Sequence, residues 1–240
     1  MPRDKVDRRG EYKEVVYDEK QWLLIREKRA KAKPLLEELS KRGIEAFIHG
    51  SVARGDVSPQ SDVDIIIPEY KPSYIIELVL DNLGYKAYSR EIIQATPFHT
   101  PKLYYILDPR EELVVSVPLA KLLSRELEFY KWGGMIGLRE LEEEKRVAGV
   151  NKKLKLIIPT PTGHIEIPVI GREAEVASIL GISIETVNER VRVLTRRDEI
   201  GRTGVFLKIS LREDEVPESV LRDIASKNPM LRRVLRDRGY

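Results

Sequence analysis

The sequence contains no cysteine, which excludes disulfide bonds, cysteine-ligated zinc sites and thiol nucleophiles. It has only three histidines, His49, His99 and His164, so a bound metal ion would be held mainly by carboxylates. Long apolar runs are also missing. The longest, such as the one within residues 64–68, are far shorter than the roughly 20 apolar residues of a bilayer-spanning helix. Residues 1–5 lack the apolar segment of a signal peptide. We therefore expect a cytoplasmic protein without a membrane segment.

Charge of one sign is not in excess, because 42 Lys+Arg stand against 39 Asp+Glu, giving a formal net charge of +3. The 240 residues are 42% hydrophobic, which is enough apolar material for a packed core and for one large or two modest domains. Abundant Lys, Arg and Glu with few Asn and Gln resemble proteins from hot environments. The charge content alone therefore does not indicate a nucleic-acid partner.

The first half of the chain alternates helical and strand periodicities. Helices are predicted at 18–42, with Pro34 inside it, and at 73–83. Strands are predicted at 44–49, 63–67, 85–95, 102–107 and 112–117. This order predicts a mixed α/β fold (α+β) with a mixed sheet that is largely antiparallel towards its end.

The second half begins with helical periodicity over 119–148, broken at Gly133-Gly134, and continues with a hairpin whose strands are 154–158 and 164–170. Two short helices at 172–180 and 184–195, joined by a glycine turn, match the helix-turn-helix pattern. Arg202-Thr203-Gly204 and the strand 205–211 would add a wing, which makes this part winged-helix-like. We expect four parts: a first domain at 1–125, a helical and hairpin connector at 126–168, the helix-turn-helix domain at 169–212, and a basic tail at 213–240.

The most informative stretch runs from Phe47 to Ile67 and contains Gly50-Ser51 and the pair Asp62 and Asp64. Two carboxylates two residues apart on a strand leave the same face, while the alternating apolar residues Val63, Ile65 and Ile67 face the opposite layer. Like charges repel, and a divalent cation such as Mg²⁺ removes that cost. A glycine lets the backbone approach phosphate oxygens, and Ser51 can donate its hydroxyl. We expect the two carboxylates to project towards Gly50-Ser51 at one edge of the sheet.

This segment resembles the signature of the polymerase-beta-type nucleotidyltransferase superfamily, in which Gly-Ser is followed after a short loop by Asp-hydrophobic-Asp. The resemblance implies that residues 1–125 adopt the nucleotidyltransferase fold. It implies that Asp62 and Asp64 are catalytic and bind Mg²⁺ or Mn²⁺. It further implies that the NTP is bound by Gly50, Ser51, Arg54 and Ser61.

Members of this superfamily also use a third carboxylate on a later strand, commonly as a general base. The corresponding strand here, 112–117, has Ser116 at the equivalent position, and serine cannot act as a base or an anionic ligand at neutral pH. Glu112 and Asp108 remain as alternatives if the strand is offset.

The second helix of the helix-turn-helix predicts a nucleic-acid interface. Docking in a major groove would place Thr186, Asn188 and Arg190 near bases. The later arginines, Arg192, Arg196 and Arg197, would lie near phosphates. Such a unit also serves as an RNA-binding or protein-docking module, and two glutamates of the same helix would repel a nucleic-acid backbone.

Together these features predict an enzyme that transfers an NMP from an NTP to a hydroxyl acceptor, with RNA or DNA as the expected partner and a protein hydroxyl as another acceptor. The alternative is a nucleotidyltransferase-fold protein with weak or no activity that acts as a nucleic-acid-binding or regulatory module. The difference between them depends on the third carboxylate.

Overall fold

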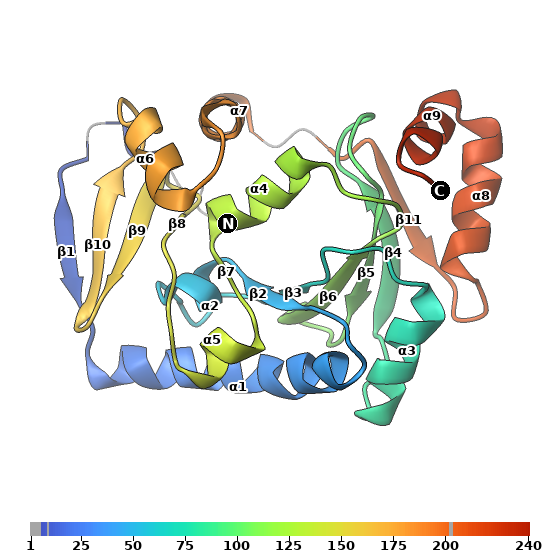
Figure 1. The fold of residues 1–240 in the computed structure, drawn as a ribbon, viewed down its shortest axis with the longest axis horizontal. Coiled ribbons are helices and arrows are strands. Elements are labelled where there is room, and N and C mark those ends of the chain that lie inside the picture. The colour runs from blue at the N-terminus through green and yellow to red at the C-terminus, as the bar shows by residue number, and fades with distance from the viewer. Residues whose placement is uncertain (1–5, 9, 202–203) are drawn as a thin grey trace. The chain divides into compact units, whose positions relative to one another are not determined.

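The computed structural model describes residues 6–8, 10–201 and 204–240, and the chain forms two compact units (Figure 1). The first unit comprises Met1–Arg29, Ile48–Ser61 and Leu127–Thr203. The second comprises Ala30–Phe47, Asp62–Glu126 and Gly204–Tyr240. Each unit is thus assembled from segments that lie far apart in the sequence.

The first unit contains a four-stranded antiparallel sheet in the order β1-β10-β9-β8. Its strands are β1 (Lys13–Val16), β8 (Gly149–Val150), β9 (Lys155–Thr160) and β10 (Gly163–Pro168). β9 and β10 confirm the predicted hairpin. β1 was not predicted, because this mostly exposed edge strand lacks apolar alternation. β1 and β10 approach so closely that a Cβ on Gly163 would collide with the carbonyl of Val15, which requires glycine there.

Helices of the first unit pack on this sheet through one apolar cluster that includes Leu156, Val176 and Val187. α6 (Glu173–Leu180) and α7 (Ile184–Ile200) confirm the predicted helix pair, with the turn at Gly181 in the left-handed region. α7 continues beyond the predicted end at Thr195. The two helices are therefore fastened to the hairpin sheet by side chains from their facing sides.

The other elements with residues in the first unit are one long helix and several short helices and strands. They are α1 (Glu19–Lys41), β2 (Phe47–His49), α2 (Ser51–Arg54), α4 (Ser124–Gly133), β7 (Met135–Ile136) and α5 (Leu138–Glu142). β2 pairs with β7, and α1, β2 and α4 have residues in both units. The helical prediction over 119–148 holds only for α4 and α5, since β7 interrupts it just after the break at Gly133.

The second unit contains five strands in the order β11-β4-β5-β6-β3. They are β3 (Val63–Ile66), β4 (Ser89–Gln94), β5 (Lys102–Ile106), β6 (Leu113–Pro118) and β11 (Leu207–Leu211). β3 runs parallel to β6 and the other pairs are antiparallel, which confirms a mixed sheet. α3 (Ser73–Asn82) covers the face that carries Tyr105 and Arg90, since both side chains bond to it.

The C-terminal segment differs from the winged-helix prediction. Arg202 and Thr203 of the expected wing lie outside the described residues, and β11 pairs with β4 in the sheet of the second unit. β11 is therefore a strand of that sheet and not a wing, because its backbone hydrogen bonds go to β4. The basic tail forms two helices, α8 (Pro217–Lys227) and α9 (Pro229–Asp237), which lie against each other (Figure 1).

Candidate nucleotidyltransferase site

The acidic pair lies at the start of β3. Val63 and Ile65 are completely buried on the α3 side of the sheet, so Asp62 and Asp64 leave the opposite face. Asp62 is exposed and Asp64 is half-buried. Asp62 forms no hydrogen bond or ion pair with any residue that the structure describes. Its carboxylate oxygens are therefore available to a ligand.

Register places Ser116 on the same face as Asp64. Asp64 pairs with Val114 of β6, and Ser116 follows two residues later opposite Ile66. The Ser116 side chain is 6% exposed, so this position is a buried neutral site. Among the described residues no group of three or more His, Asp or Glu side chains could hold a metal ion. Within the part of the chain that the structure describes, no third carboxylate joins Asp62 and Asp64.

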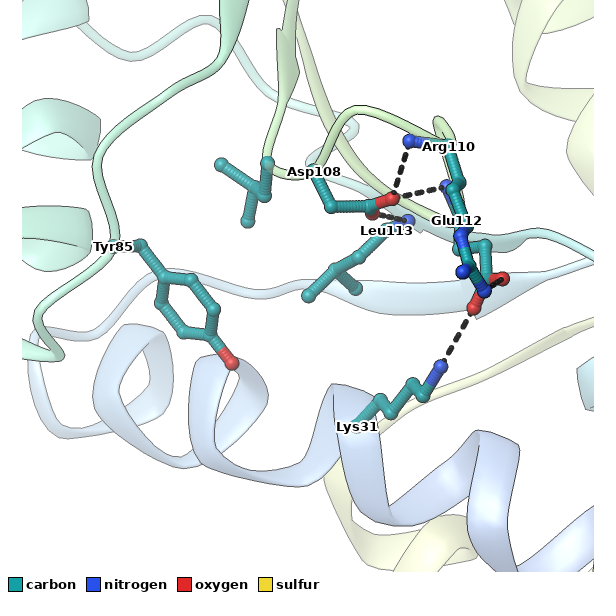
Figure 2. A pocket seen from close by; sticks show the side chains of 7 residues that line it. Lys31, Tyr85, Asp108, Arg110, Glu112 and Leu113 are labelled. Carbon is teal, nitrogen blue, oxygen red and sulfur yellow. Dashed lines mark hydrogen bonds and ion pairs between the residues drawn. The ribbon is translucent and has the colours of Figure 1, made fainter.

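The two alternative carboxylates line a separate pocket of about 310 Å³ in the second unit (Figure 2). Glu112 is 2.7 Å from the ammonium of Lys31 on α1. Asp108 accepts hydrogen bonds from the backbone N–H groups of Arg110, Glu112 and Leu113. Burial alone would raise the pKa of Asp108, but these hydrogen bonds outweigh it and lower the pKa. Asp108 thus closes the turn between β5 and β6, while the Glu112 carboxylate is paired with α1.

Two side chains of β5 on the Asp64 face were not anticipated. Tyr104 lies opposite Ser116, and Lys102 lies two residues away on the same face. Burial raises the pKa of Tyr104 to about 12, and the charge of Asp64 adds to that rise. Burial lowers the pKa of Lys102 to about 8, against the opposing charge of Glu126. Alternation along β5 could have placed them on one face, but only the register showed that this face carries Asp64.

The Gly50-Ser51 turn lies in the first unit, directly before α2. Gly50 has φ of 83°, and its N–H donates to the carbonyl of Gly134 at 2.9 Å. Nothing would crowd a Cβ at Gly50, so the positive φ is what favours glycine there. Ser51 is half-buried at the start of α2. The Oγ of Ser61 accepts from the backbone N–H of Ser58 at 2.9 Å and closes the loop that follows.

Arg54 is buried, and its guanidinium is engaged within the first unit. It donates two hydrogen bonds to the Asp56 carboxylate, both at 3.0 Å, and a third to the carbonyl of Gly133 at 2.5 Å. Such a bidentate pair fixes the planar guanidinium in one orientation. Arg54 therefore shapes the turn that carries Gly50 and Ser51.

Two buried cations of α1, Lys28 and Arg29, support the same segment. Arg29 donates to the carbonyls of Val52 at 3.1 Å and Ala53 at 3.2 Å, and Lys28 donates to the carbonyl of Pro59 at 3.2 Å. Burial lowers the pKa of Arg29 to about 10, with the Arg146 charge acting in the same direction. In the sequence, the only indication of this role is that two charged residues interrupt the otherwise apolar face of the helix that became α1.

The predicted nucleic-acid residues of α7 divide into two groups. Asn188, Arg192, Arg196 and Arg197 are exposed, as expected. Thr186 was expected to point outward, and this was wrong: its side chain is 2% exposed, and its hydroxyl donates to the carboxylate of Glu128 on α4.

Arg190 is also turned inward, one helical turn after Thr186. Its guanidinium lies over the ring of Phe129 at 4.8 Å from the centroid, and burial lowers its pKa to about 10. Thr186 and Arg190 are four residues apart and so share one side of α7. That side faces α4 within the first unit, which the sequence alone could not show.

Comparisons with known proteins agree with the first-half motif. The family model of the nucleotidyltransferase domain matches residues 29–132, which include Gly50, Ser51, Asp62 and Asp64. No curated protein and no solved structure matched the chain. Within the described ranges 6–8, 10–201 and 204–240, no helix has the length and apolar character of a membrane span. The family match supports placing residues 29–132 in the nucleotidyltransferase superfamily.

Proposed function

We propose that this protein is a Mg²⁺-dependent nucleotidyltransferase that moves an NMP from an NTP to a hydroxyl acceptor. The observation that carries the proposal is the acidic pair: Asp62 and Asp64 leave one face of β3 inside the region matched by the nucleotidyltransferase family model. The reaction class is an in-line attack of the acceptor hydroxyl on the α-phosphorus, with pyrophosphate leaving.

The donor set of β3 suits Mg²⁺, and Mn²⁺ would fit the same oxygen ligands. Mg²⁺ is commonly held by one or two carboxylates together with substrate phosphates and water. Asp62 supports this fit because it is exposed and has no protein partner among the described residues. When bound, the metal would neutralise charge on the phosphate oxygens during displacement.

The triphosphate contacts are assigned to the Gly50-Ser51 turn. The backbone at Gly50 has no Cβ to obstruct a phosphate, and the hydroxyl of Ser51 is a hydrogen-bond donor. Arg54 and Ser61 are assigned supporting roles, because Arg54 is bonded to Asp56 and Ser61 to the loop backbone. Positioning by such bonds lowers the entropic cost of aligning the α-phosphate.

Among the described residues, the site lacks an evident general base to remove the proton of the acceptor hydroxyl. Ser116 cannot remove it at neutral pH, while the carboxylate of Glu112 is paired with Lys31 and that of Asp108 is bonded to backbone N–H groups. A general base is worth roughly 10²–10⁴ in rate, so we infer a slow enzyme. The exposed side chains Asn188, Arg192, Arg196 and Arg197 favour an acceptor on RNA or DNA over a protein hydroxyl, because arginines on one helix suit phosphates.

The experiment is Mg²⁺-dependent NTP binding by the double variant Asp62→Asn, Asp64→Asn. Removing two like charges relieves repulsion, so the variant should melt at or above the wild-type temperature while its NTP affinity falls at least about tenfold. The matched control is Asp81→Asn, Asp223→Asn, which removes two exposed carboxylates from the same unit. NTP affinity that stays unchanged in the first variant would refute the assignment of the metal site.

A further inference from the structure

Three tyrosines of the second unit form an exposed surface that the proposed reaction does not use. Tyr70 precedes α3, Tyr74 lies in its first turn, and Tyr240 follows α9. All three are exposed, and Tyr74 most of all at 67%. Single exposed aromatic side chains are ordinary on protein surfaces, but several together mark a candidate interaction site.

Tyr70 lies close enough to interact electrostatically with both other tyrosines, and Tyr70 and Tyr240 both interact with two residues of α8. The charges of Glu218 and Arg222 and the hydroxyl of Tyr74 influence the titration of Tyr70. Arg222, Tyr70 and Glu218 likewise influence Tyr240. Burial, the largest cause in both cases, raises the pKa of Tyr70 and of Tyr240 above its usual value, so both hydroxyls stay protonated at neutral pH. We refer to Tyr70, Tyr74, Tyr240 and Arg222 as the tyrosine platform.

The platform rests on a fixed support. The Glu218 carboxylate accepts hydrogen bonds from the backbone N–H and the hydroxyl of Ser73, at 2.7 and 2.8 Å, and so ties α8 to the start of α3. The hydroxyl of Tyr240 donates to the carbonyl of Glu218 at 3.1 Å. These bonds fix the Tyr240 side chain and hold α8 beside the start of α3, where Tyr74 directly follows Ser73.

The C-terminal segment that forms α8 and α9 has a net positive charge. Residues 217–240 carry six Lys and Arg and only three Asp and Glu, one of which, Glu218, is bonded to Ser73. Arg222 is exposed and has no carboxylate partner among the described residues. On α9 the arginines Arg232, Arg233 and Arg236 are also exposed. The surface thus offers flat rings beside Arg222, whereas Arg233 and Arg236 on α9 are paired with Asp237.

We propose that the tyrosine platform binds single-stranded nucleic acid, with bases stacked on Tyr74 and Tyr70 and a phosphate paired with Arg222. Aromatic rings accept any base by its π-face, and arginine neutralises the backbone, which together give binding without sequence preference. The occupant must have unstacked bases, because a duplex presents its phosphates and not its base faces. This binding is separate from the proposed nucleotidyl transfer and needs neither NTP nor metal.

The test uses the full chain in EDTA, with fluorescence anisotropy of labelled oligo(U) and oligo(dT) of about 12 nucleotides. Tyr74→Leu keeps an apolar side chain but removes the ring, and should weaken binding by roughly 5- to 100-fold. Tyr74→Phe keeps the ring and should stay within about twofold of wild type. Tyr88 is the matched control, since it is 65% exposed in the same unit but lies before β4, and Tyr88→Leu should bind normally. Arg222→Gln should flatten the slope of log K against log[salt] by about 0.7.

The proposal is overturned if Tyr74→Leu binds like wild type, or if Tyr74→Phe loses as much affinity as Tyr74→Leu. It is also overturned if wild type is a dimer in sedimentation that Tyr74→Leu dissociates without changing oligonucleotide affinity, because the surface would then be an interface between copies. The variant Asp62→Asn, Asp64→Asn should bind oligonucleotide normally in EDTA. Failure of the metal site would therefore leave this result unaffected, and the two proposals fail separately.

Discussion

Arg29 offers the sharpest test of how the Gly50-Ser51 turn is held. Its side chain is 6% exposed and donates to the carbonyls of Val52 and Ala53 at the end of α2. Hydrogen bonds from a charged donor contribute about 1.5–3 kcal/mol each, so the two contribute roughly 3–6 kcal/mol. Burial opposes this contribution, since the pKa of Arg29 falls from 12.5 to about 10, which corresponds to a cost of about 3 kcal/mol.

The variant Arg29→Met removes both contributions and keeps the aliphatic volume. The net loss in unfolding free energy should be about 0–3 kcal/mol, which for a chain of this size lowers Tm by up to roughly 10 °C. Arg29→Lys keeps the charge but not the planar guanidinium, so its Tm should lie between those of wild type and Arg29→Met. Arg26→Met is the matched control, because Arg26 is an exposed arginine on the same helix.

Hydrogen exchange separates a local role from a general loss of stability. The amides of Ala53, Arg54 and Gly55 donate to the carbonyls of Gly50 and Ser51, so they report directly on the turn. In Arg29→Met these amides should exchange faster than the loss of global stability requires, and the NTP dissociation constant should rise about tenfold. Exchange at wild-type rates in these three amides would show that Arg29 does not hold the turn.

Two further predictions concern the face of the second unit's sheet that carries Asp64. Ser116→Asp places a buried anion beside two others, so the Tm of this variant should fall in EDTA. Its Mg²⁺-induced rise in Tm should exceed that of wild type, and any nucleotidyl transfer should be faster. Fast nucleotidyl transfer by wild type that this variant abolishes would contradict the placement of Ser116 at the third-carboxylate position. Lys102 has its pKa lowered to about 8 by burial, while an unfolded lysine titrates near 10.5, so the folded state releases this proton first and stability rises as pH increases from about 8 to about 10.5. Relative to Lys102→Met, wild type should therefore gain up to about 3 kcal/mol of unfolding free energy over that range in urea titrations, and a difference independent of pH would refute the depressed pKa.

Local periodicity was sufficient for the elements whose signals lie within a few residues. The sequence by itself predicted α1, α3, the β9–β10 hairpin and the helix pair α6–α7, because each has an apolar pattern of its own and a glycine or proline boundary. It also predicted that Asp62 and Asp64 share one face of a strand, which follows from the two-residue period of β-structure.

Tertiary structure decided everything that depends on a distant partner. The alternating pattern of β11 predicts a strand whether it belongs to a wing or to a larger sheet. Its pairing with β4 makes it part of the second unit's sheet and not a wing. Thr186 is polar and reads as surface, yet Glu128 satisfies its hydroxyl and so allows its burial. The role of Arg29 follows the same rule: a lone cation on a helix predicts solvent exposure, and buried carbonyls more than twenty residues away in the chain turn it into a support for the turn.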